Sequence, residues 1–292
     1  MDIITKYGVL SNCQEVTYHK GNVLATAFTH ALTKLNTSIG KIRLAHDFSS
    51  ERRKYIPSVK FFKDGTLQAV NLDRHVSVKT AIGNFNCEYI TFYQSGAPRR
   101  LLHLNGKLSG YWSEQQETEL AENTVLNLPC GLITAKVMTL HLYEDGMPSS
   151  ITFFPGTVVP VMTGLGCLKT RIGISFYPNG ALQSLEPAAP LEIQTPLGKI
   201  RAFDTEPIGI IGDNNSLLWD ENGELCSCKT TDNLTITFAS GAVTTLAADL
   251  KQSMCSDEVM VKSPYTLSWD KNKIYIDGIG TKKLIYNRLD LA

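Results

Sequence analysis

The feature that most constrains this chain is a short phrase that recurs along it, in which two apolar runs flank a polar loop ending in glycine. The copies begin at residues 61, 92, 142, 176 and 219 and read "FFKDGTLQAV", "FYQSGAPRRL", "LYEDGMPSSI", "FYPNGALQSL" and "WDENGELCSC". Pro at the first loop position, Asp, Asn or Ser at the second and Gly at the third suit a three-residue hairpin loop whose glycine has positive φ and forms a bulge. The phrase predicts five tight β-hairpins, with a looser sixth copy around Gly21.

A second recurring phrase lies between these polar loops and also contains a turn glycine. Its copies are "NTSIGKI", "KTAIGNF", "NLPCGLI", "MTGLGCL" and "QTPLGKI", beginning at residues 36, 79, 127, 162 and 194. An apolar residue precedes the glycine each time, which a loop tip facing only water would not need. We therefore expect these apolar turns to pack against neighbouring structure.

The spacing of the glycines sets the architecture. From polar loop to apolar turn the steps are 19 (21 to 40), 18 (65 to 83), 35 (96 to 131), 20 (146 to 166), 18 (180 to 198) and 18 (223 to 241). Segments such as "EYITFY", "RIGISFY", "LTITFA" and "KIYIDGI" alternate and are rich in β-branched and aromatic residues, as strands are. The sequence predicts an all-β chain of about six hairpin modules.

We interpret the chain as a single repeat-built domain, residues 1–292, with an insertion at 102–123 and a C-terminal cap at 251–292. Within the insertion, "SEQQETELAEN" (113–123) is the one expected helix. Three architectures suit such modules: an open antiparallel meander or solenoid, a closed β-propeller, or stacked sandwiches. Module spacings near 31–35 residues are short for a four-stranded propeller blade, and the uneven period favours the open array.

The polar phrase, aromatic–Tyr–x–Asn–Gly–x–Leu as in residues 176–182, resembles the MORN-variant repeats of bacterial antitoxin-like proteins. The resemblance covers about ten residues of each module. It implies a meandering antiparallel sheet used for protein contacts rather than for catalysis. The longer period and the added apolar turn depart from the MORN-variant pattern.

Charge and cysteine content narrow the choice of partners and location. The chain has 28 basic and 28 acidic residues, whereas a nucleic-acid binder carries a positive excess, so no nucleic-acid partner is expected. The basic and aromatic stretch 51–63 is interpreted as a solvated linker. The first residues lack the pattern of a signal peptide, and no apolar run is long enough for a membrane span. Seven cysteines without dense spacing predict a reduced, cytoplasmic protein with no membrane partner.

Catalytic and metal-binding motifs are absent from the sequence, so we expect no catalytic residue, cofactor or metal site and lean away from an enzyme. Cys226 and Cys228 form a C-x-C pair without a second pair of ligands, and we interpret them as buried structural cysteines. His103 and His141 stand on opposite sides of the insertion and are interpreted as strand residues rather than as a catalytic pair.

The insertion supplies the candidate partner-binding residues, because insertions in repeat arrays often lie on the binding face. They form an acidic patch with a neighbouring tryptophan: Glu114, Glu117, Glu119, Glu122 and Trp112. The sequence favours a non-enzymatic protein-interaction scaffold. One alternative is a carbohydrate-binding module that uses Trp112 and the aromatic pairs at 92–93 and 176–177. The other is an enzyme whose site is assembled from dispersed residues.

Overall fold

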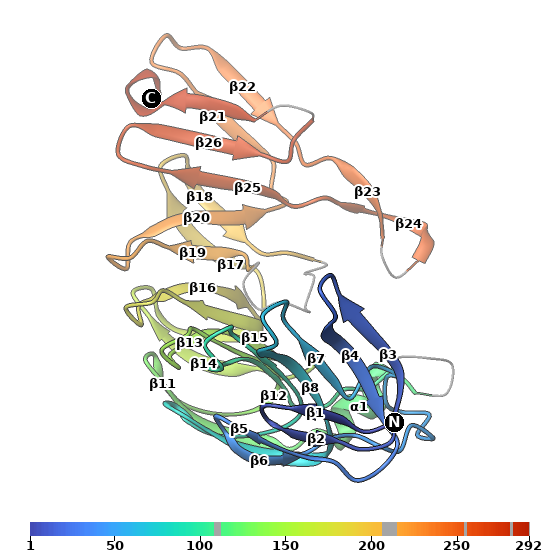
Figure 1. The fold of residues 1–292 in the computed structure, drawn as a ribbon. Helices are drawn as coiled ribbons and strands as arrows, with labels where there is room; N and C mark the ends of the chain where they lie inside the picture. The colour runs from blue at the N-terminus through green and yellow to red at the C-terminus, as the bar shows by residue number, and fades with distance from the viewer. Residues whose placement is uncertain (108–111, 206–214, 254–255, 281–282, 292) are drawn as a thin grey trace. The chain divides into compact units, whose positions relative to one another are not determined.

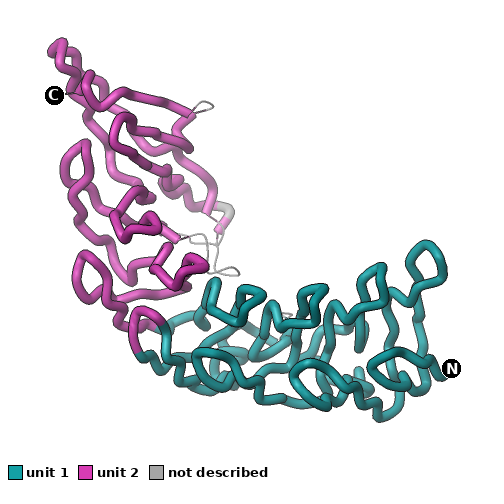
Figure 2. Tube along the Cα trace, turned by 60° about the vertical axis from the view of Figure 1, so that its left-hand side comes forward, with its two compact units in different colours: residues 1–128, 132–157 teal, residues 129–131, 158–292 magenta. Residues whose placement is uncertain are grey.

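The computed structural model describes residues 1–107, 112–205, 215–253, 256–280 and 283–291 (Figure 1). The chain divides into two compact units (Figure 2). Unit 1 comprises residues 1–128 and 132–157, and unit 2 comprises residues 129–131 and 158–292. Both are built of antiparallel strands, and each is described below by itself.

Unit 1 contains one large antiparallel sheet and two separate two-stranded hairpins. The sheet runs β3–β4–β7–β8–β9–β10–β12–β13 by strand pairing, and β11 belongs to the same sheet. The sheet strands are β3 (Cys13–His19), β4 (Val23–Thr29), β7 (Val59–Phe61), β8 (Leu67–Thr80), β9 (Gly83–Phe92), β10 (Pro98–Leu102), β11 (Asn123–Leu128), β12 (Gly131–Leu142) and β13 (Pro148–Phe153). The hairpins are β1 (Ile3–Thr5) with β2 (Gly8–Leu10) and β5 (Lys34–Thr37) with β6 (Gly40–Arg43). A single α-helix, α1 (Glu114–Leu120), follows β10.

Unit 2 also combines one large antiparallel sheet with separate two-stranded hairpins, three of them among the described residues. Its sheet runs β14–β15–β16–β19–β20–β25–β26–β27, with every neighbouring pair antiparallel. These strands are β14 (Val159–Thr163), β15 (Gly166–Phe176), β16 (Leu182–Pro187), β19 (Leu217–Trp219), β20 (Leu225–Thr230), β25 (Tyr265–Trp269), β26 (Lys273–Asp277) and β27 (Leu284–Asn287). The separate hairpins are β17 (Leu191–Thr195) with β18 (Gly198–Ala202), β21 (Leu234–Thr237) with β22 (Val243–Leu246) and β23 (Leu250–Ser253) with β24 (Ser256–Lys262). A short 3₁₀ turn, η1 (Arg288–Asp290), follows β27.

The polar loops have the predicted three-residue geometry. At the β9–β10 loop the N–H of Gly96 donates to the carbonyl of Tyr93 at 2.9 Å, and the N–H of Tyr93 donates to the carbonyl of Ala97 at 2.8 Å. The same pair of bonds closes the loops that end at Gly65, Gly146, Gly180 and Gly223. All five glycines have φ between 75° and 91°, and the strand register shifts beside each loop, as a bulge requires. At the looser sixth copy, both Gly21 and Asn22 have positive φ.

Four of the five apolar turns contain a threonine that the sequence reading did not single out, and the Cys130–Gly131 turn does not. In the β17–β18 turn the Thr195 hydroxyl donates to the carbonyl of Gly198 at 2.8 Å and accepts from the N–H of Leu197 at 3.1 Å. The first of these bonds recurs in four further turns, from Thr5 to Gly8, Thr37 to Gly40, Thr80 to Gly83 and Thr163 to Gly166. Of the apolar tips, Ile82 is buried as expected, whereas Leu165 is 45% exposed.

Alternation along the strands separates an apolar face from a polar face in each sheet. In unit 1 one cross-strand row is fully buried and consists of Ala27, Val59, Val70, Ile90, Leu101, Leu140 and Ile151. The adjacent row points to the opposite face and consists of Thr26, Lys60, Ala69, Thr91, Arg100, His141 and Ser150. In unit 2 the buried row contains Ile174, Leu185, Leu217, Cys228, Leu267 and Ile276. The core of each unit therefore lies on one face of its sheet.

The two units share sequence and hydrogen bonding at positions 158 residues apart. "TSIGKIR" at 37 corresponds to "TPLGKIR" at 195. The N–H of Asn71 donates to the Ser58 carbonyl at 2.9 Å, and the N–H of Lys229 donates to the Ser216 carbonyl at 2.8 Å. A hairpin from each sheet thus has the same backbone contact at the same spacing along the chain.

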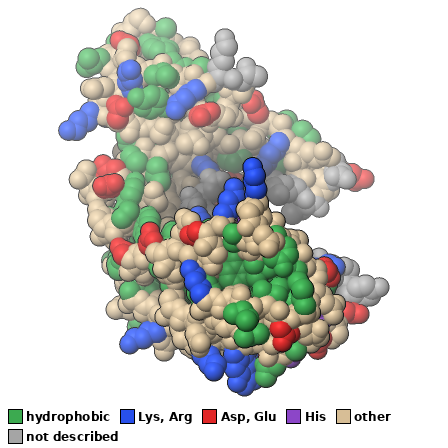
Figure 3. Space-filling model, viewed as in Figure 1, with side chains coloured by type: hydrophobic (Ala, Val, Ile, Leu, Met, Phe, Trp, Pro, Cys, Tyr) green, Lys and Arg blue, Asp and Glu red, His purple; other side chains and the backbone are tan. Residues whose placement is uncertain are grey.

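The fold is the expected all-β array of antiparallel hairpins, an open sheet rather than a closed ring. Its one α-helix falls within the predicted segment 113–123. The interpretation of 1–292 as one repeat-built domain stays a prediction beside the two compact units. Residues 251–292, expected to form a cap, include strands that continue the unit 2 sheet. Within the described ranges, no helix has the length and apolar character needed to span a membrane. Side chains of both charge signs are spread over the surface seen in Figure 3.

Candidate functional site

The insertion of unit 1 contains the helix α1, whose first turn has a capping box formed by Ser113 and Gln116. Ser113 caps α1, since its hydroxyl accepts from the N–H of Gln116 and the Gln116 side chain accepts from the N–H of Ser113. On the helix, Glu117 is only 7% exposed. Its carboxylate accepts from the N–H of Gly106 at 2.9 Å and from the indole N–H of Trp112. The helix is therefore tied to the start of the insertion through a buried carboxylate.

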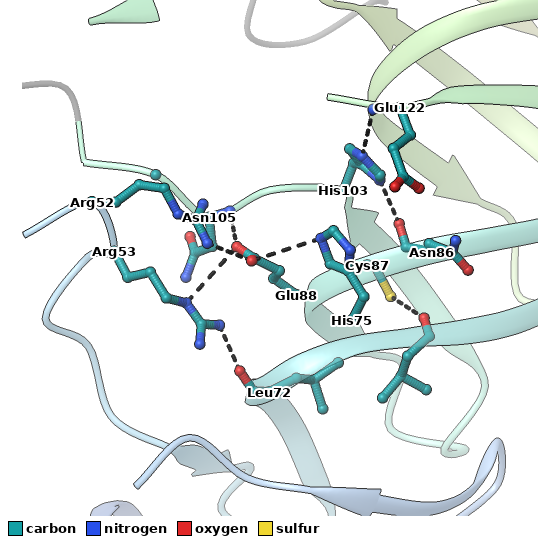
Figure 4. A network of polar contacts seen from close by, with 12 residues as sticks. Arg52, Arg53, Leu72, His75, Asn86, Cys87, Glu88, His103, Asn105 and Glu122 are labelled. Atoms are coloured by element: carbon teal, nitrogen blue, oxygen red, sulfur yellow. Dashed lines mark hydrogen bonds and ion pairs between the residues drawn. The ribbon is translucent and has the colours of Figure 1, made fainter. Parts of the chain in front are cut away.

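A second buried carboxylate, Glu88 of β9, lies at the centre of the polar network in Figure 4. Its Oε1 accepts from Arg52 Nη2 at 2.5 Å, and its Oε2 accepts from the N–H of Asn105 at 2.9 Å. Arg53 Nε lies 3.8 Å from Oε2, and His75 Nε2 lies 3.7 Å from Oε1. Burial raises the pKa of Glu88, but the Arg52 hydrogen bond, the Arg53 charge and the Asn105 N–H together bring that pKa below its ordinary value. Glu88 is thus ionised and held on several sides.

The two arginines connect this carboxylate to the rest of unit 1. Arg52 Nη1 lies 3.7 Å from the carboxylate of Glu117, so one guanidinium contacts both buried acids. Arg53 donates to the carbonyls of Leu72 and Asp73 at the bend of β8. Two arginines face two buried glutamates, and their charges balance. The network therefore fixes segment 51–53 and the insertion against the sheet.

His103 is buried between the network and the core, stacked on His75 with ring centroids 5.0 Å apart. Its Nδ1 donates to the Asn86 carbonyl at 2.8 Å, and its Nε2 accepts from the N–H of Glu122 at 3.2 Å. Burial lowers the pKa of His103, which agrees with a neutral ring whose two nitrogens are both occupied. This imidazole holds two backbone segments together and has no nitrogen left for proton transfer. His141 lies on β12, in the cross-strand row beside Arg100.

The predicted partner-binding residues separate into two groups. Glu114, Glu119 and Glu122 are exposed. Glu117 and the half-buried Trp112 contact each other inside the insertion. Sequence reasoning missed Glu88, Arg52 and Arg53 as a unit. The available signal was an acidic residue within the buried strand "CEYITF", which needs a cationic partner.

Unit 2 has its own buried carboxylate, Glu186 of β16, which is fully buried. It accepts from the N–H of Ser216 at 2.8 Å and lies 3.6 Å from Arg171 Nη2. Burial outweighs these contacts and raises the pKa of Glu186 above its ordinary value. The Arg171 guanidinium packs over the ring of Phe203 at 4.4 Å. This cluster holds Phe203, Asp204 and Ser216 against β15 and β16.

The aromatic pairs considered as sugar platforms have structural contacts. Phe92 and Phe176 are buried in the cores. The hydroxyls of Tyr93 and Tyr177 donate to the carbonyls of Leu142 and Trp219, which join neighbouring hairpins. Each ring is therefore used within the fold rather than presented as a free platform.

The cysteine pair of β20 behaves as a structural feature. Cys228 is 1% exposed, and burial raises the pKa of its thiol to about 12. Cys226 is half-buried, donates to the Leu218 carbonyl and also has a pKa raised by burial. In the part of the chain that the structure describes, no three His, Cys, Asp or Glu side chains are grouped as a metal site requires.

The hairpin β23–β24 of unit 2, which we call the apolar ribbon, carries several exposed apolar side chains. Its strands pair with each other and with no other described strand. Leu250 and Met260 lie on one face and are 64% and 57% exposed, and Val259 on the other face is 48% exposed. The ribbon is anchored at its base, where the N–H of Ser263 donates to the Asp249 carbonyl at 2.6 Å. Apolar side chains are thus presented on both faces.

Comparison of the chain with protein-family models, with curated proteins and with solved structures finds no match. The class of the protein is therefore set by the fold alone, as an all-β array of antiparallel hairpins. The resemblance to MORN-variant repeats stays a prediction.

Proposed function

We propose that this chain is a non-enzymatic protein-interaction scaffold. The observation that carries the proposal is the apolar ribbon, whose large side chains Leu250, Val259 and Met260 are about half exposed or more. A two-stranded hairpin by itself is marginally stable in water, and exposed apolar patches mark interaction surfaces. A protein partner with an apolar surface would cover these side chains.

The buried ionisable groups support a binding role rather than a catalytic one. Glu88, Glu186 and His103 are occupied by hydrogen bonds and ion pairs within their own units. The thiols of Cys87 and Cys228 have pKa values raised by burial, which is opposite to the shift that activates a nucleophile. The chemistry brought together by folding therefore stabilises the hairpin array.

A cytoplasmic location and a MORN-like mode of protein contact are parts of the same proposal. All six described cysteines are free thiols, as a reducing compartment favours. The exposed acids Glu114, Glu119 and Glu122 of the insertion offer a second contact surface, for a basic segment of the partner.

The test compares partner capture by the native chain, by Leu250→Ser/Met260→Ser and by Leu132→Ser. Leu132 is 69% exposed on β12 of unit 1 and serves as a matched control. A photo-crosslinking residue at 259 on the native and control chains should yield a discrete adduct, identified by mass spectrometry. The same crosslinker on the double variant should yield none.

Identical adducts from all three chains, or adducts from none, would overturn the proposal. Light scattering distinguishes a further outcome. A dimer that requires Leu250 and Met260 would mean that a second copy of the chain covers the ribbon, in place of a separate partner. Because the substituted side chains are exposed, unfolding free energies should stay within about 0.5 kcal/mol of the native value.

A further inference from the structure

The polar face of the unit 1 sheet contains a hollow lined by polar and charged side chains. It has a volume of about 330 Å³ and is open to solvent, with side chains from β7, β8, β9 and β10 around it. This volume lies at the lower end of the range for small-ligand sites. Most of its lining belongs to the face opposite the buried row of the sheet, and the buried side chains of Ala69 and Phe92 also line it.

Strand register places two cations on opposite sides of a shallow floor. Lys60, Ala69, Thr91 and Arg100 occupy one cross-strand row, from β7 to β10. Three strand spacings separate Lys60 from Arg100, so their Cα atoms are about 14 Å apart. Ala69 and Thr91 between them are short. Tyr89 lies two residues before Thr91 and therefore points to the same face.

Most polar side chains of the hollow have no partner among the described residues, the exception being Arg99, whose guanidinium lies over the ring of Tyr93 at 5.5 Å. Among the residues that the structure describes, the side chains of Lys60, Gln68, Tyr89, Thr91 and Arg100 form no hydrogen bond or ion pair. No acidic residue lines the hollow. Lys60 and Arg100 are both partly buried, where a charge without a counter-ion is costly. By contrast, Arg52 in the same unit contacts two carboxylates.

We propose that this hollow binds an anionic oligosaccharide, a sugar chain that carries carboxylate or sulfate groups. Lys60 and Arg100 supply donors to the anionic groups, through the charge-assisted hydrogen bonds that both side chains form with carboxylates and sulfates. The side chains of Gln68, Tyr89 and Thr91 can each donate and accept hydrogen bonds, as sugar hydroxyls can. The ring of Tyr89 adds an apolar surface beside the floor.

The strand pairing disfavours a peptide ligand at this position. Each of β7, β8, β9 and β10 is paired on both sides, so the face offers no free backbone N–H or C=O to a bound main chain. A peptide lying there would leave its own backbone groups to water. The balanced charge of the whole chain, with 28 basic and 28 acidic residues, disfavours a nucleic acid.

The test is calorimetric titration of the full chain with four probes. Three are saccharides: trigalacturonate, its neutral methyl ester and a heparin-derived tetrasaccharide. The fourth is hexaglutamate, and a six-nucleotide thymidine oligomer serves as an additional nucleic-acid control. We expect at least one of the two anionic saccharides to bind, and added salt should weaken its affinity. If the carboxylate groups are recognised, the neutral ester should bind at least about tenfold more weakly than trigalacturonate. The saccharide that binds identifies the anion as carboxylate or sulfate.

Variants locate the site. Lys60→Gln and Arg100→Gln should each weaken saccharide binding about tenfold, because each removes a charge-assisted contact. Tyr89→Phe should weaken it a few-fold while leaving the ring in place. Lys79→Gln, at an exposed lysine of β8, should leave the affinity unchanged.

Four results would overturn the inference. The first two are no binding of either anionic saccharide, and equal binding of trigalacturonate and its ester when the heparin tetrasaccharide does not bind. The others are unchanged saccharide affinity in both the Lys60 and Arg100 variants, and tighter binding of hexaglutamate or of the oligonucleotide. The probe and salt comparisons use the native chain, so they decide the matter even if a variant does not fold. The hollow and the apolar ribbon lie on different units, and failure of either proposal leaves the other intact.

Discussion

Replacing Glu88 by Gln should destabilise unit 1 by about 2–4 kcal/mol. Glu88 accepts two charge-assisted hydrogen bonds, from Arg52 and from the N–H of Asn105. Each such bond contributes about 1.5–3 kcal/mol, and Gln keeps one acceptor oxygen. The substitution also leaves Arg52 and Arg53, whose side chains are 18% and 16% exposed, without their main counter-ion. Breaking a buried ion pair typically costs about 3–5 kcal/mol.

Hydrogen exchange with mass spectrometry measures this loss in the place where it should occur. Peptides from the insertion and from β9 should exchange faster in Glu88→Gln, whereas peptides from β25 and β26 in unit 2 should not change. Glu119→Gln removes an exposed glutamate of α1 and serves as the matched control, with an expected effect within about 0.5 kcal/mol. An effect of Glu88→Gln no larger than this control would refute the reasoning.

A double-mutant cycle and a pH series sharpen the same prediction. Arg52→Met should cost much less in the Glu88→Gln background than in the native chain, because the shared contact is already lost. The folded pKa of Glu88 lies below its ordinary value of about 4.3, so its contribution to stability is present above that pH and is lost as pH falls through the folded pKa. The variant should lack this acid-dependent loss.

Three further predictions concern the turns and the second buried carboxylate. Thr195→Val removes two hydrogen bonds of its turn and should lower the free energy of unfolding, measured in urea, by about 1 kcal/mol. Thr235→Val, at an exposed position of β21, should leave it almost unchanged. Gly146→Ala, at φ +87°, should cost about 1–2 kcal/mol, whereas Gly164→Ala, which lacks positive φ and has only ordinary contacts, should cost less; equal effects would contradict the predicted loop geometry. Burial raises the pKa of Glu186, so its neutral form favours folding, and unit 2 should lose stability as pH rises from about 4.3 through the folded pKa. Glu186→Gln should flatten that pH dependence, and an unchanged pH profile would show that the carboxylate is not the cause.

The hairpin array could be predicted in detail because its information is local. A polar loop such as Gln94-Ser95-Gly96 specifies its geometry within four residues, since only glycine adopts the left-handed conformation at low cost. Alternation in the flanking strands then decides which side chains face the core. The capped helix of the insertion was predictable for the same reason, from Ser113 and Gln116.

The candidate sites were not predictable, because they bring together residues from separate strands. Glu88 contacts Arg52, 36 positions earlier in the chain, and only the folded chain places them within bonding distance. Burial of Glu117, one of four glutamates of the acidic stretch, depends on Gly106, 11 positions away. The hollow between Lys60 and Arg100 requires the register of four strands. The sequence by itself therefore determined the hairpins, their turns and the all-β class. The tertiary structure decided which charges are paired, which side chains are left without partners and where the hollow lies, because those properties depend on distances between segments remote in the chain.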